Sequence, residues 1–390
     1  MSSKLRVGVV FGGRSVEHEV SIISAKSVIA SVDRERFDII PIGVTKEGRW
    51  LSADDSLRLL NGDKVGDGGL NLLAVGSERF RGLVAVEDPA FSDSVKNTPP
   101  ESSGAVNGNF GKRRSSVDVI FPLIHGAYGE DGRLQGLLEL ADIPYVGSGP
   151  LSSALGMDKD IMKKLFALND LPVLKCRTAY WHEWKKEKDT VIGSIYREIG
   201  IPFFVKPANT GSSVGISKVK NENGILEACE EAFRYDNKII VEKGINAREI
   251  ECSVLGNDEP KASVPGEIVP CNEFYDYKAK YLDERSELLI PAPLSVQQIR
   301  LVQEIAVKAF KTLECSGMAR VDFLFDKDTG SFYLNELNTI PGFTPISMYP
   351  KLWEASGISN RDLISRLIEL AVERHRSGKR IETSYRPDTI

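Results

Sequence analysis

The segment "GMARVDFLFDKDTGSFYLNELNTIPG", residues 317–342, constrains the fold more than any other part of the chain. Its first half alternates apolar and polar residues, which is the period-two pattern of a β-strand. The turn sequence "DKDTG" follows, and "FYLNELN" then predicts the partner strand. A turn centred near Asp328 and Thr329 brings four polar groups together on one face of an antiparallel pair. These four groups are Arg320, Asp322, Glu336 and Asn338.

This predicted polar face has the composition of a magnesium site. Two carboxylates and an amide oxygen are hard ligands of the kind that Mg²⁺ prefers, and Mg²⁺ usually shares its coordination shell with substrate phosphates. Arg320 beside them suits an anionic substrate or a charge that develops during a reaction. The alternative is a solvated sheet face held by cross-strand ion pairs. The apolar opposite face and the turn at Pro341 and Gly342, which frees a backbone N–H just past Asn338, favour a site.

The segment "FVKPANTGSSVGISKV", residues 204–219, places a lysine before a loop of small residues. It is not a Walker A loop, because Lys206 precedes the glycines and residues 214–219 predict a strand rather than a helix. Since no helix N-terminus is available for an anion, the pattern favours a hairpin lid. The backbone N–H groups of such a lid fold over phosphates, while the lysine at its base reaches the same charge. An ordinary hairpin with a solvated lysine is the alternative.

Composition narrows the classes of function. The chain has 390 residues, 42% of them hydrophobic and 27% charged, as in a globular protein of two or three domains. A net charge of -5 does not favour nucleic-acid binding. We expect no membrane span and no signal peptide, because the apolar runs are too short. The dispersed cysteines indicate reduced thiols and a cytoplasmic location, and the histidines lack zinc-ligand spacing, so we expect oxygen ligands for any metal.

The order of the predicted elements indicates an α/β protein, α+β in part. Residues 5–11, "LRVGVVF", predict a buried strand, residues 17–31 a helix and "FDIIPIGV" the next strand, which is a doubly wound opening. The pattern weakens over residues 45–116, and the composition of residues 92–116 predicts a mobile surface loop. We expect three domains and a loose tail, at residues 1–149, 150–241, 242–378 and 379–390.

Three further motifs carry polar residues with more than one interpretation. "GGRSVEHEVS" places Glu17 at a strand end, where α/β proteins bind ligands, although an acid stabilised by a helix dipole gives the same pattern. "HGAYGEDG" puts His125 at another strand end, in a structural or a functional role. "FYDYKAKY", residues 274–281, combines aromatic residues with Lys278 and Lys280. It suits either a lid over an anionic substrate or an exposed turn.

In their order and spacing these motifs resemble those of the D-alanine–D-alanine ligase family of the ATP-grasp superfamily. The resemblance covers nearly the whole chain, through "GGRSVEHEVS", "HGAYGEDG", "MDK", "VKPANTGSSVG", "VEK", "FYDYKAKY", "RVDF" and "NELNTIPG". Residues 45–116 match least, and we expect an insertion there. The resemblance implies an ATP-grasp fold in which ATP is clamped between the central and C-terminal domains, with the glycine-serine hairpin as a lid over its phosphates.

The resemblance also implies a role for each matching residue. The residues expected to bind ATP are Lys159, Lys206, Ser213, Glu242, Lys243, Ile245, Glu249 and Phe274. Gly244 stands where some relatives carry an aromatic residue, which weakens the expectation of adenine stacking from that side. The residues expected in catalysis are Glu17, Ser212, Tyr281, Arg320, Gly342 and Ser347, and those expected to hold D-alanine are His125 and Lys280. The ligands expected for two Mg²⁺ ions, with Mn²⁺ as an alternative, are Asp322, Glu336 and Asn338.

The implied reaction is the ATP-dependent ligation of two D-alanine molecules to D-alanyl-D-alanine for peptidoglycan synthesis. The carboxylate of the first D-alanine attacks the γ-phosphate of ATP, and the amine of the second attacks the resulting acyl phosphate. Phosphorylation supplies the leaving group, so the protein needs mainly positioning and charge stabilisation. The implied partners are ATP, D-alanine and a second copy of the chain in a homodimer.

Two other functions compete with this one. A D-alanine–D-lactate ligase, or an ATP-grasp ligase of another amino acid, keeps the fold and changes the substrate. Tyr281 after Lys280 resembles the dipeptide-forming type and weighs against it. A nucleotide-binding regulatory protein without catalysis is the second alternative, but such a protein has no need of Arg320 beside its metal ligands.

Overall fold

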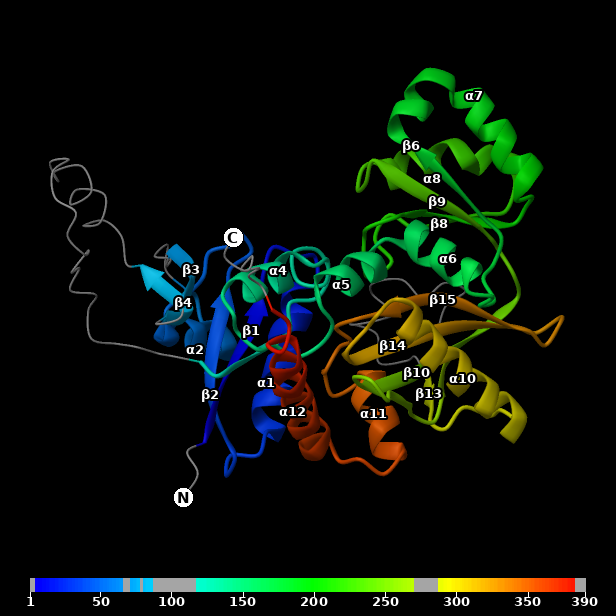
Figure 1. Ribbon diagram of the computed structural model, residues 1–390. Coiled ribbons are helices and arrows are strands. Elements are labelled where there is room, and N and C mark those ends of the chain that lie inside the picture. Colours follow the sequence, from blue (N-terminus) through cyan, green and yellow to red (C-terminus); the bar gives the residue numbers. More distant parts are fainter. Residues whose placement is uncertain (1–3, 66–70, 78–79, 87–116, 270–286, 383–390) are drawn as a thin grey trace, which may run out of the picture.

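The computed structural model describes residues 4–65, 71–77, 80–86, 117–269 and 287–382 (Figure 1). The strands of these residues form three sheets and one separate hairpin, with helices packed on the sheets. The predicted α/β fold with α+β parts is therefore confirmed. The domain boundaries predicted from the sequence stay a prediction.

The N-terminal sheet is parallel, with the strand order β2-β1-β5. Strand β1 (Leu5–Gly12) lies between β2 (Phe37–Val44) and β5 (Val119–Pro122). Six consecutive residues of β1 are buried, as expected for a parallel strand that is covered on both faces. Helix α1 (His18–Ser31) follows β1 and packs on the sheet. The strands and the helix predicted for residues 5–44 are confirmed, and their loops lie at the carboxyl edge where such sheets bind ligands.

The region of weak sequence pattern contains a helix and a hairpin that the sequence analysis did not assign. Helix α2 (Ala53–Asn61) has a signal that was overlooked, because Ser52 caps its start by accepting a hydrogen bond from the Asp55 N–H at 3.1 Å. Gly62 ends the helix with a φ of 87°. The hairpin of β3 (Asn71–Ser77) and β4 (Phe80–Val86) pairs only within itself among the described strands. Residues 92–116, predicted to be mobile, lie outside the described residues.

Helix α4 (Arg133–Leu140) still packs on the N-terminal sheet. The central part begins with α5 (Pro150–Met157) and α6 (Lys159–Leu168) and contains an antiparallel sheet of order β6-β9-β7-β8. The strands are β6 (Cys176–Tyr180), β7 (Phe203–Pro207), β8 (Ser217–Val219) and β9 (Lys238–Lys243). Helices α7 (Trp181–Glu198) and α8 (Ile225–Phe233) cover one face of this sheet (Figure 1), with Trp184 and Phe203 buried between the layers.

The C-terminal sheet is antiparallel, with the order β13-β12-β10-β14-β15 and β11 paired to β10. Its strands are β10 (Ala247–Gly256), β11 (Lys261–Ala262), β12 (Gly266–Val269), β13 (Glu287–Leu289), β14 (Gly317–Asp326) and β15 (Phe332–Asn338). Helix α10 (Val296–Thr312) covers the apolar face, where Val321 and Phe323 of β14 are buried, and α11 (Met348–Ala355) packs near β10. The predicted strand pair and its turn at Asp328 and Thr329 are therefore confirmed.

The last helix, α12 (Asn360–Gly378), returns to the N-terminal sheet (Figure 1). Its buried leucines share one hydrophobic core with Val7 and Phe11 of β1. At the start of the helix Arg361 forms an ion pair with Asp33 at 2.6 Å. The two ends of the described chain are thus joined by apolar packing.

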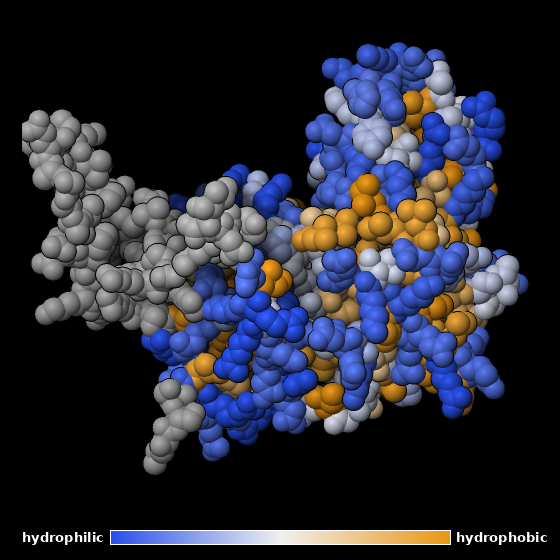
Figure 2. Space-filling model, viewed as in Figure 1, coloured by the Kyte–Doolittle hydropathy of each residue, from blue (hydrophilic) through white to orange (hydrophobic). Residues whose placement is uncertain are grey.

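Helix α6 has an unusual distribution of polarity. Figure 2 shows an apolar band over this part of the surface, between more hydrophilic regions, and Ile161 and Leu168 are exposed on α6. The buried side of the same helix carries Met162 and Phe166 in a hydrophobic core, but also Lys159, Asp160 and Lys163. Since lysine is rarely buried unless it is paired, the two lysines indicate that the inner face of α6 also meets polar partners.

Within the described ranges, the helices are too short or too polar for any of them to cross a membrane.

Replacing Leu367 of α12 with alanine tests the joined core. The side chain has no exposed surface, so we expect Leu367→Ala to lower the free energy of unfolding by about 2–5 kcal/mol. The neighbouring Arg366 is exposed, and Arg366→Ala should change this free energy by no more than about 0.5 kcal/mol. Urea unfolding followed by circular dichroism measures both. Equal effects of the two substitutions would contradict the packing of α12 on the N-terminal sheet.

Candidate active site

The strand pair β14–β15 has the register that the sequence predicted. Asp322 lies opposite Glu336, and Arg320 lies opposite Asn338. The pairing shifts between Asp322 and Phe323, because β15 carries one extra residue, Asn335. Bulges of this kind redirect side chains next to functional sites. The four predicted polar groups therefore converge on one face of the sheet.

Arg320 is held by carboxylates on two strands. Its Nε and Nη2 atoms donate to the two oxygens of Asp322, both at 2.7 Å, and Nε lies 2.9 Å from an oxygen of Glu251 on β10. Burial disfavours the charge of Arg320, but the attraction of Asp322 and Glu251 outweighs it and raises the pKa of the guanidinium. The sequence analysis missed Glu251. Nothing in the local sequence marks this acid as a partner of Arg320, which lies on another strand.

A second cluster of charges lies between β7, β9 and β15. Lys206 of β7 donates to Glu242 at 2.6 Å and to the Asn335 side chain at 3.2 Å. Burial lowers the pKa of Lys206, but Glu242 overcomes this effect and raises it. Burial raises the pKa of Glu242, but the positive charges of Lys163 and Lys206 overcome this effect and lower it. Lys163 and Asn335 were also missed, because nothing in the local sequence marks them as partners of this cluster.

The glycine-serine loop connects two strands, but the second strand begins later than predicted. β7 and β8 pair antiparallel, and the sequence analysis placed the second strand at residues 214–219. The structure has a strand only at residues 217–219. Ser212, Ser213 and Gly215 have φ angles of 51°, 58° and 71°, so the chain is still turning there.

The loop contacts two predicted site residues. The ammonium group of Lys159, at the start of α6, donates to the carbonyl of Thr210 at 2.8 Å and lies 3.7 Å from an oxygen of Glu336. The Ser212 hydroxyl donates to the Glu17 carboxylate. The loop thus connects the N-terminal domain to the polar face of β15.

Glu17 lies at a junction of three loops. It occupies the N-cap position of α1 and is buried. A Cβ atom at Gly126 would lie 2.6 Å from one of its carboxylate oxygens, and a Cβ atom at Gly211 would lie 3.0 Å from the same oxygen. Both loops can approach the carboxylate so closely because those positions are glycine.

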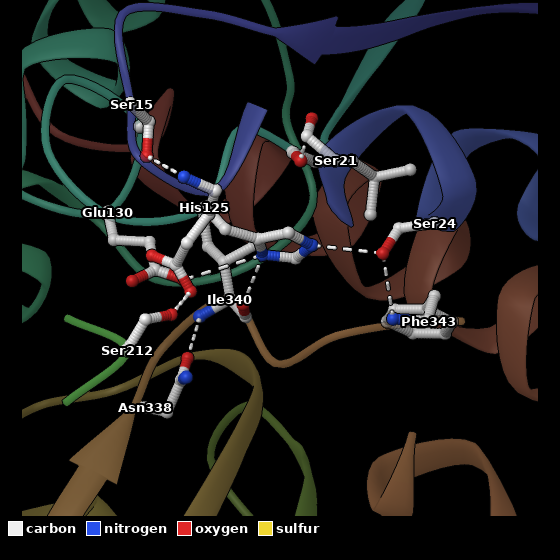
Figure 3. Close-up of polar contacts among 12 residues, drawn as sticks. Ser15, Ser21, Ser24, His125, Glu130, Ser212, Asn338, Ile340 and Phe343 are labelled. Atoms are coloured by element: carbon white, nitrogen blue, oxygen red, sulfur yellow. Dashed lines mark hydrogen bonds and ion pairs between the residues drawn. The ribbon is translucent and has the colours of Figure 1, made fainter. Parts of the chain in front are cut away.

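His125 is buried between the N-terminal sheet and the loop after β15 (Figure 3). Its Nδ1–H donates to the Ile340 carbonyl at 3.0 Å, and its Nε2 atom forms a 3.0 Å hydrogen bond with Ser24. Burial lowers the pKa of His125, but the carboxylate of Glu130, 3.6 Å from Nδ1, outweighs burial and raises it. Burial is also the main cause that raises the pKa of Glu130. His125 is thus fixed in orientation on both sides of its ring.

The loop after β15 brings Gly342 against Ser347, the N-cap residue of α11. A Cβ atom at Gly342 would lie 2.7 Å from the Ser347 hydroxyl, so a side chain at position 342 would displace this group. The hydroxyl accepts from the Thr344 N–H at 2.9 Å. Asn338 also stabilises this loop, because its side-chain oxygen Oδ1 accepts a hydrogen bond from the Ile340 N–H at 3.0 Å (Figure 3).

The predicted adenine-binding residues lie where β9 leads into β10. The ammonium group of Lys243 donates to the carbonyls of Gly200 and Ile201, at 3.2 and 2.9 Å. A Cβ atom at Gly244 would lie 3.1 Å from the Pro202 carbonyl oxygen, so an aromatic residue would require the chain to shift. Ile245 follows in the connecting loop, and Glu249 of β10 lies opposite Leu324. The three predicted residues Phe274, Lys280 and Tyr281 lie outside the described residues.

The donor set on β14 and β15 fits a divalent cation. Asp322, Glu336 and Asn338 offer hard oxygen ligands on one sheet face, and the ammonium group of Lys159 lies 3.7 Å from Glu336. In the described part of the chain, no three His, Cys, Asp or Glu side chains gather into a metal-type cluster. A cation at this face would therefore need the amide oxygen of Asn338 or oxygens of a bound phosphate in addition to the two carboxylates.

Comparison with known families assigns both halves of the chain. Residues 6–148 match the family described as "D-ala D-ala ligase N-terminus", and residues 165–369 match "D-ala D-ala ligase C-terminus". A curated D-alanine–D-alanine ligase of Heliobacterium modesticaldum is 47% identical over 385 residues, which are 98% of this chain and 99% of the relative. The ligase of Caldicellulosiruptor bescii is 48% identical over 384 residues, with the same coverage.

Solved structures agree with these relatives. The D-alanine-D-alanine ligase of Coxiella burnetii superimposes with a TM-score of 0.78 at 35% identity and covers 97% of both chains. The VanG D-Ala:D-Ser ligase of Enterococcus faecalis also has a TM-score of 0.78 at 35% identity, and it covers 95% of this chain and 100% of its own. These ligases have the ATP-grasp fold. Glu17 and His125 lie in the first family region, and Lys206, Asp322 and Glu336 lie in the second. The chain therefore belongs to the D-alanine–D-alanine ligase family.

Proposed function

We propose that the described residues form one active site in which ATP activates a D-alanine carboxylate for attack by the amine of a second D-alanine. The reaction is the ATP-dependent synthesis of D-alanyl-D-alanine for peptidoglycan, and the curated relatives that cover 98% of this chain are named D-alanine–D-alanine ligase. The observation that carries the proposal is the 3.7 Å distance between the Lys159 ammonium group and a carboxylate oxygen of Glu336. This contact brings a lysine expected to bind phosphate next to the polar face of β15.

The nucleotide lies between the central and C-terminal sheets in this proposal. Lys159 and Lys206 hold the phosphates, and the loop around Ser213 closes over them. Support comes from the loop itself, because Lys159 already donates to the Thr210 carbonyl at its base. Glu242, Lys243, Ile245 and Glu249 line the adenosine side, with Phe274 from the segment outside the described residues.

Two Mg²⁺ ions would be held by Asp322, Glu336 and Asn338. Mn²⁺ is the alternative metal. Such a cation neutralises phosphate charge and leaves the γ-phosphate open to attack. The protein's own contribution is to keep the carboxylates of Asp322 and Glu336 together, because these two residues lie opposite each other in the strand pair. Arg320 holds Asp322 through two hydrogen bonds and so fixes its orientation.

The first D-alanine is bound through its ammonium group by Glu17, with His125 behind it. Glu17 is buried, which strengthens its attraction for a cation, and Ser212 donates to its carboxylate. When the second amine attacks the acyl phosphate, negative charge forms on the carbonyl oxygen. We assign the stabilisation of this oxyanion to Nη1 of Arg320 and the backbone N–H of Gly342.

The second D-alanine is bound through its carboxylate by Ser347 and Lys280. Tyr281 joins Ser212 and Glu17 in closing the lid. The VanG structure shows that the same fold at 35% identity occurs in a ligase named for D-serine, so the fold alone does not select the second substrate. Four curated relatives, among others, are 46–48% identical and carry the name D-alanine–D-alanine ligase, which favours D-alanine here.

We also propose that the chain works in the cytoplasm as a homodimer, and that its domains are residues 1–149, 150–241 and 242–378. The family membership supports the dimer.

The experiment that tests the function is a product assay with ATP, Mg²⁺ and a panel of D-alanine, D-serine and D-lactate. We expect D-alanyl-D-alanine as the main product and phosphate release that depends on added D-alanine. A main product with D-lactate or D-serine at its C-terminus would overturn the assignment of the second substrate.

Glu336→Gln tests the metal ligands. An amide cannot supply the negative charge that a cation needs at this position, so we expect turnover to fall about 100-fold or more while the fold is kept. Phosphate release at saturating Mg²⁺ measures turnover, and circular dichroism measures the fold. The matched control is Glu354→Gln, at an exposed position of α11, which should turn over as the wild type does. Near-normal activity of Glu336→Gln would contradict the role.

Glu17→Gln tests the site for the first D-alanine. The substitution removes a charge-assisted hydrogen bond to the ammonium group, worth about 1.5–3 kcal/mol, so we expect KM for D-alanine to rise about tenfold or more. ATP affinity should change little, because Glu17 lies on the N-terminal side of the lid. Initial rates at varied D-alanine and varied ATP separate the two. If the substitution lowered the affinity for ATP and left KM for D-alanine unchanged, the role of Glu17 would be misassigned.

A further inference from the structure

Lys163 is a buried lysine that the assigned roles leave unexplained. Its side chain is 1% exposed, on the inner face of α6 and one helical turn after Lys159. Figure 1 shows α6 between β9 of the central sheet and β15 of the C-terminal sheet. A lysine in such a place loses its hydration, so its partners must compensate for that loss.

Both partners of Lys163 belong to strands of the nucleotide site. Its ammonium group forms an ion pair with Oε1 of Glu242 on β9 and donates to the carbonyl of Leu334 on β15 at 3.1 Å. Leu334 directly precedes the extra residue Asn335 of the bulge. One buried charge thus contacts the strand of the adenosine side and the strand that carries Glu336.

The Glu242 carboxylate is shared between two lysines. Oε1 faces Lys163, and Oε2 accepts from Lys206 at 2.6 Å. Glu249 and Glu336 also attract Lys206. Because Glu242 is 1% exposed, water does not neutralise it, and its charge must be balanced by these lysines.

We propose that Lys163 is a positioning residue for nucleotide binding, because it neutralises Glu242 and leaves the charge of Lys206 available to the phosphates of ATP. This inference rests on the role proposed above for Lys206. Without Lys163, Lys206 alone would balance Glu242, and its attraction for phosphate would be reduced.

The test compares Lys163→Met with Lys164→Met in the full-length enzyme. Lys164 is the next residue of the same helix, but it is exposed and pairs with Asp160 at 2.9 Å. Calorimetry with Mg²⁺ measures the dissociation constants of ADP and of adenosine. We expect Lys163→Met to raise the dissociation constant of ADP about tenfold. The dissociation constant of adenosine should rise less than about threefold, because adenosine has no phosphates. Lys164→Met should bind both as the wild type does.

A double-mutant cycle with Glu242→Gln separates this indirect effect of Lys163 from a direct attraction between Lys163 and the phosphates. In the Glu242→Gln background no carboxylate competes for Lys206, so removing Lys163 should change ADP affinity less than about threefold. Equal losses in both backgrounds would overturn the proposal, since they would mean that Lys163 attracts the phosphates itself. Wild-type ADP affinity in Lys163→Met would overturn it as well. If Lys163→Met does not fold, Lys163→Gln, which can still donate to the Leu334 carbonyl, replaces it in the cycle.

Lys206→Met distinguishes a failure of this inference from a failure of the proposed site. If Lys206→Met binds ADP like the wild type, the role of Lys206 itself is wrong. If Lys206→Met loses affinity while Lys163→Met does not, the site stands and the inference about Lys163 is wrong.

Discussion

The antiparallel pairing of β14 with β15 is the constraint on which the site depends. It sets Asp322 opposite Glu336 and Arg320 opposite Asn338, and it buries the other face against α10. A shift of one residue would turn the carboxylates into the core and the apolar residues outward, so burial itself fixes the register. The bulge at Asn335 then adds a contact that a regular strand would not provide, since this side chain meets Lys206 of another sheet.

Around this pair, loops from distant parts of the chain meet. The Ser212 hydroxyl reaches Glu17, the imidazole of His125 reaches the Ile340 carbonyl, and Lys159 approaches Glu336. Each of these contacts joins a different pair of elements, so the site exists only when all three sheets are in place. The packing of α12 on the N-terminal sheet supports the same arrangement from the far end of the chain.

Part of the interior of this assembly consists of paired charges. Arg320 is balanced by Asp322 and Glu251, and Glu242 is balanced by Lys163 and Lys206. Such clusters add little net stability, because desolvation offsets most of the attraction. In the function proposed above, they hold charged groups in fixed positions before a charged substrate arrives, so that little reorganisation accompanies the reaction.

The sequence by itself determined the elements whose signals are local. Alternation and a turn located β14 and β15, and buried runs with glycine located β1 and its neighbours, because strand period and turn chemistry depend on adjacent residues. The family motifs located Glu17, Lys206 and the residues around them. Only the tertiary structure decided that Glu251, Lys163 and Asn335 are partners of the site, and that the strand after the lid begins at Ser217. Their roles depend on which strands and helices meet in space, and an isolated lysine in a helix or acid in a strand carries no local sign of the partner that will bury it.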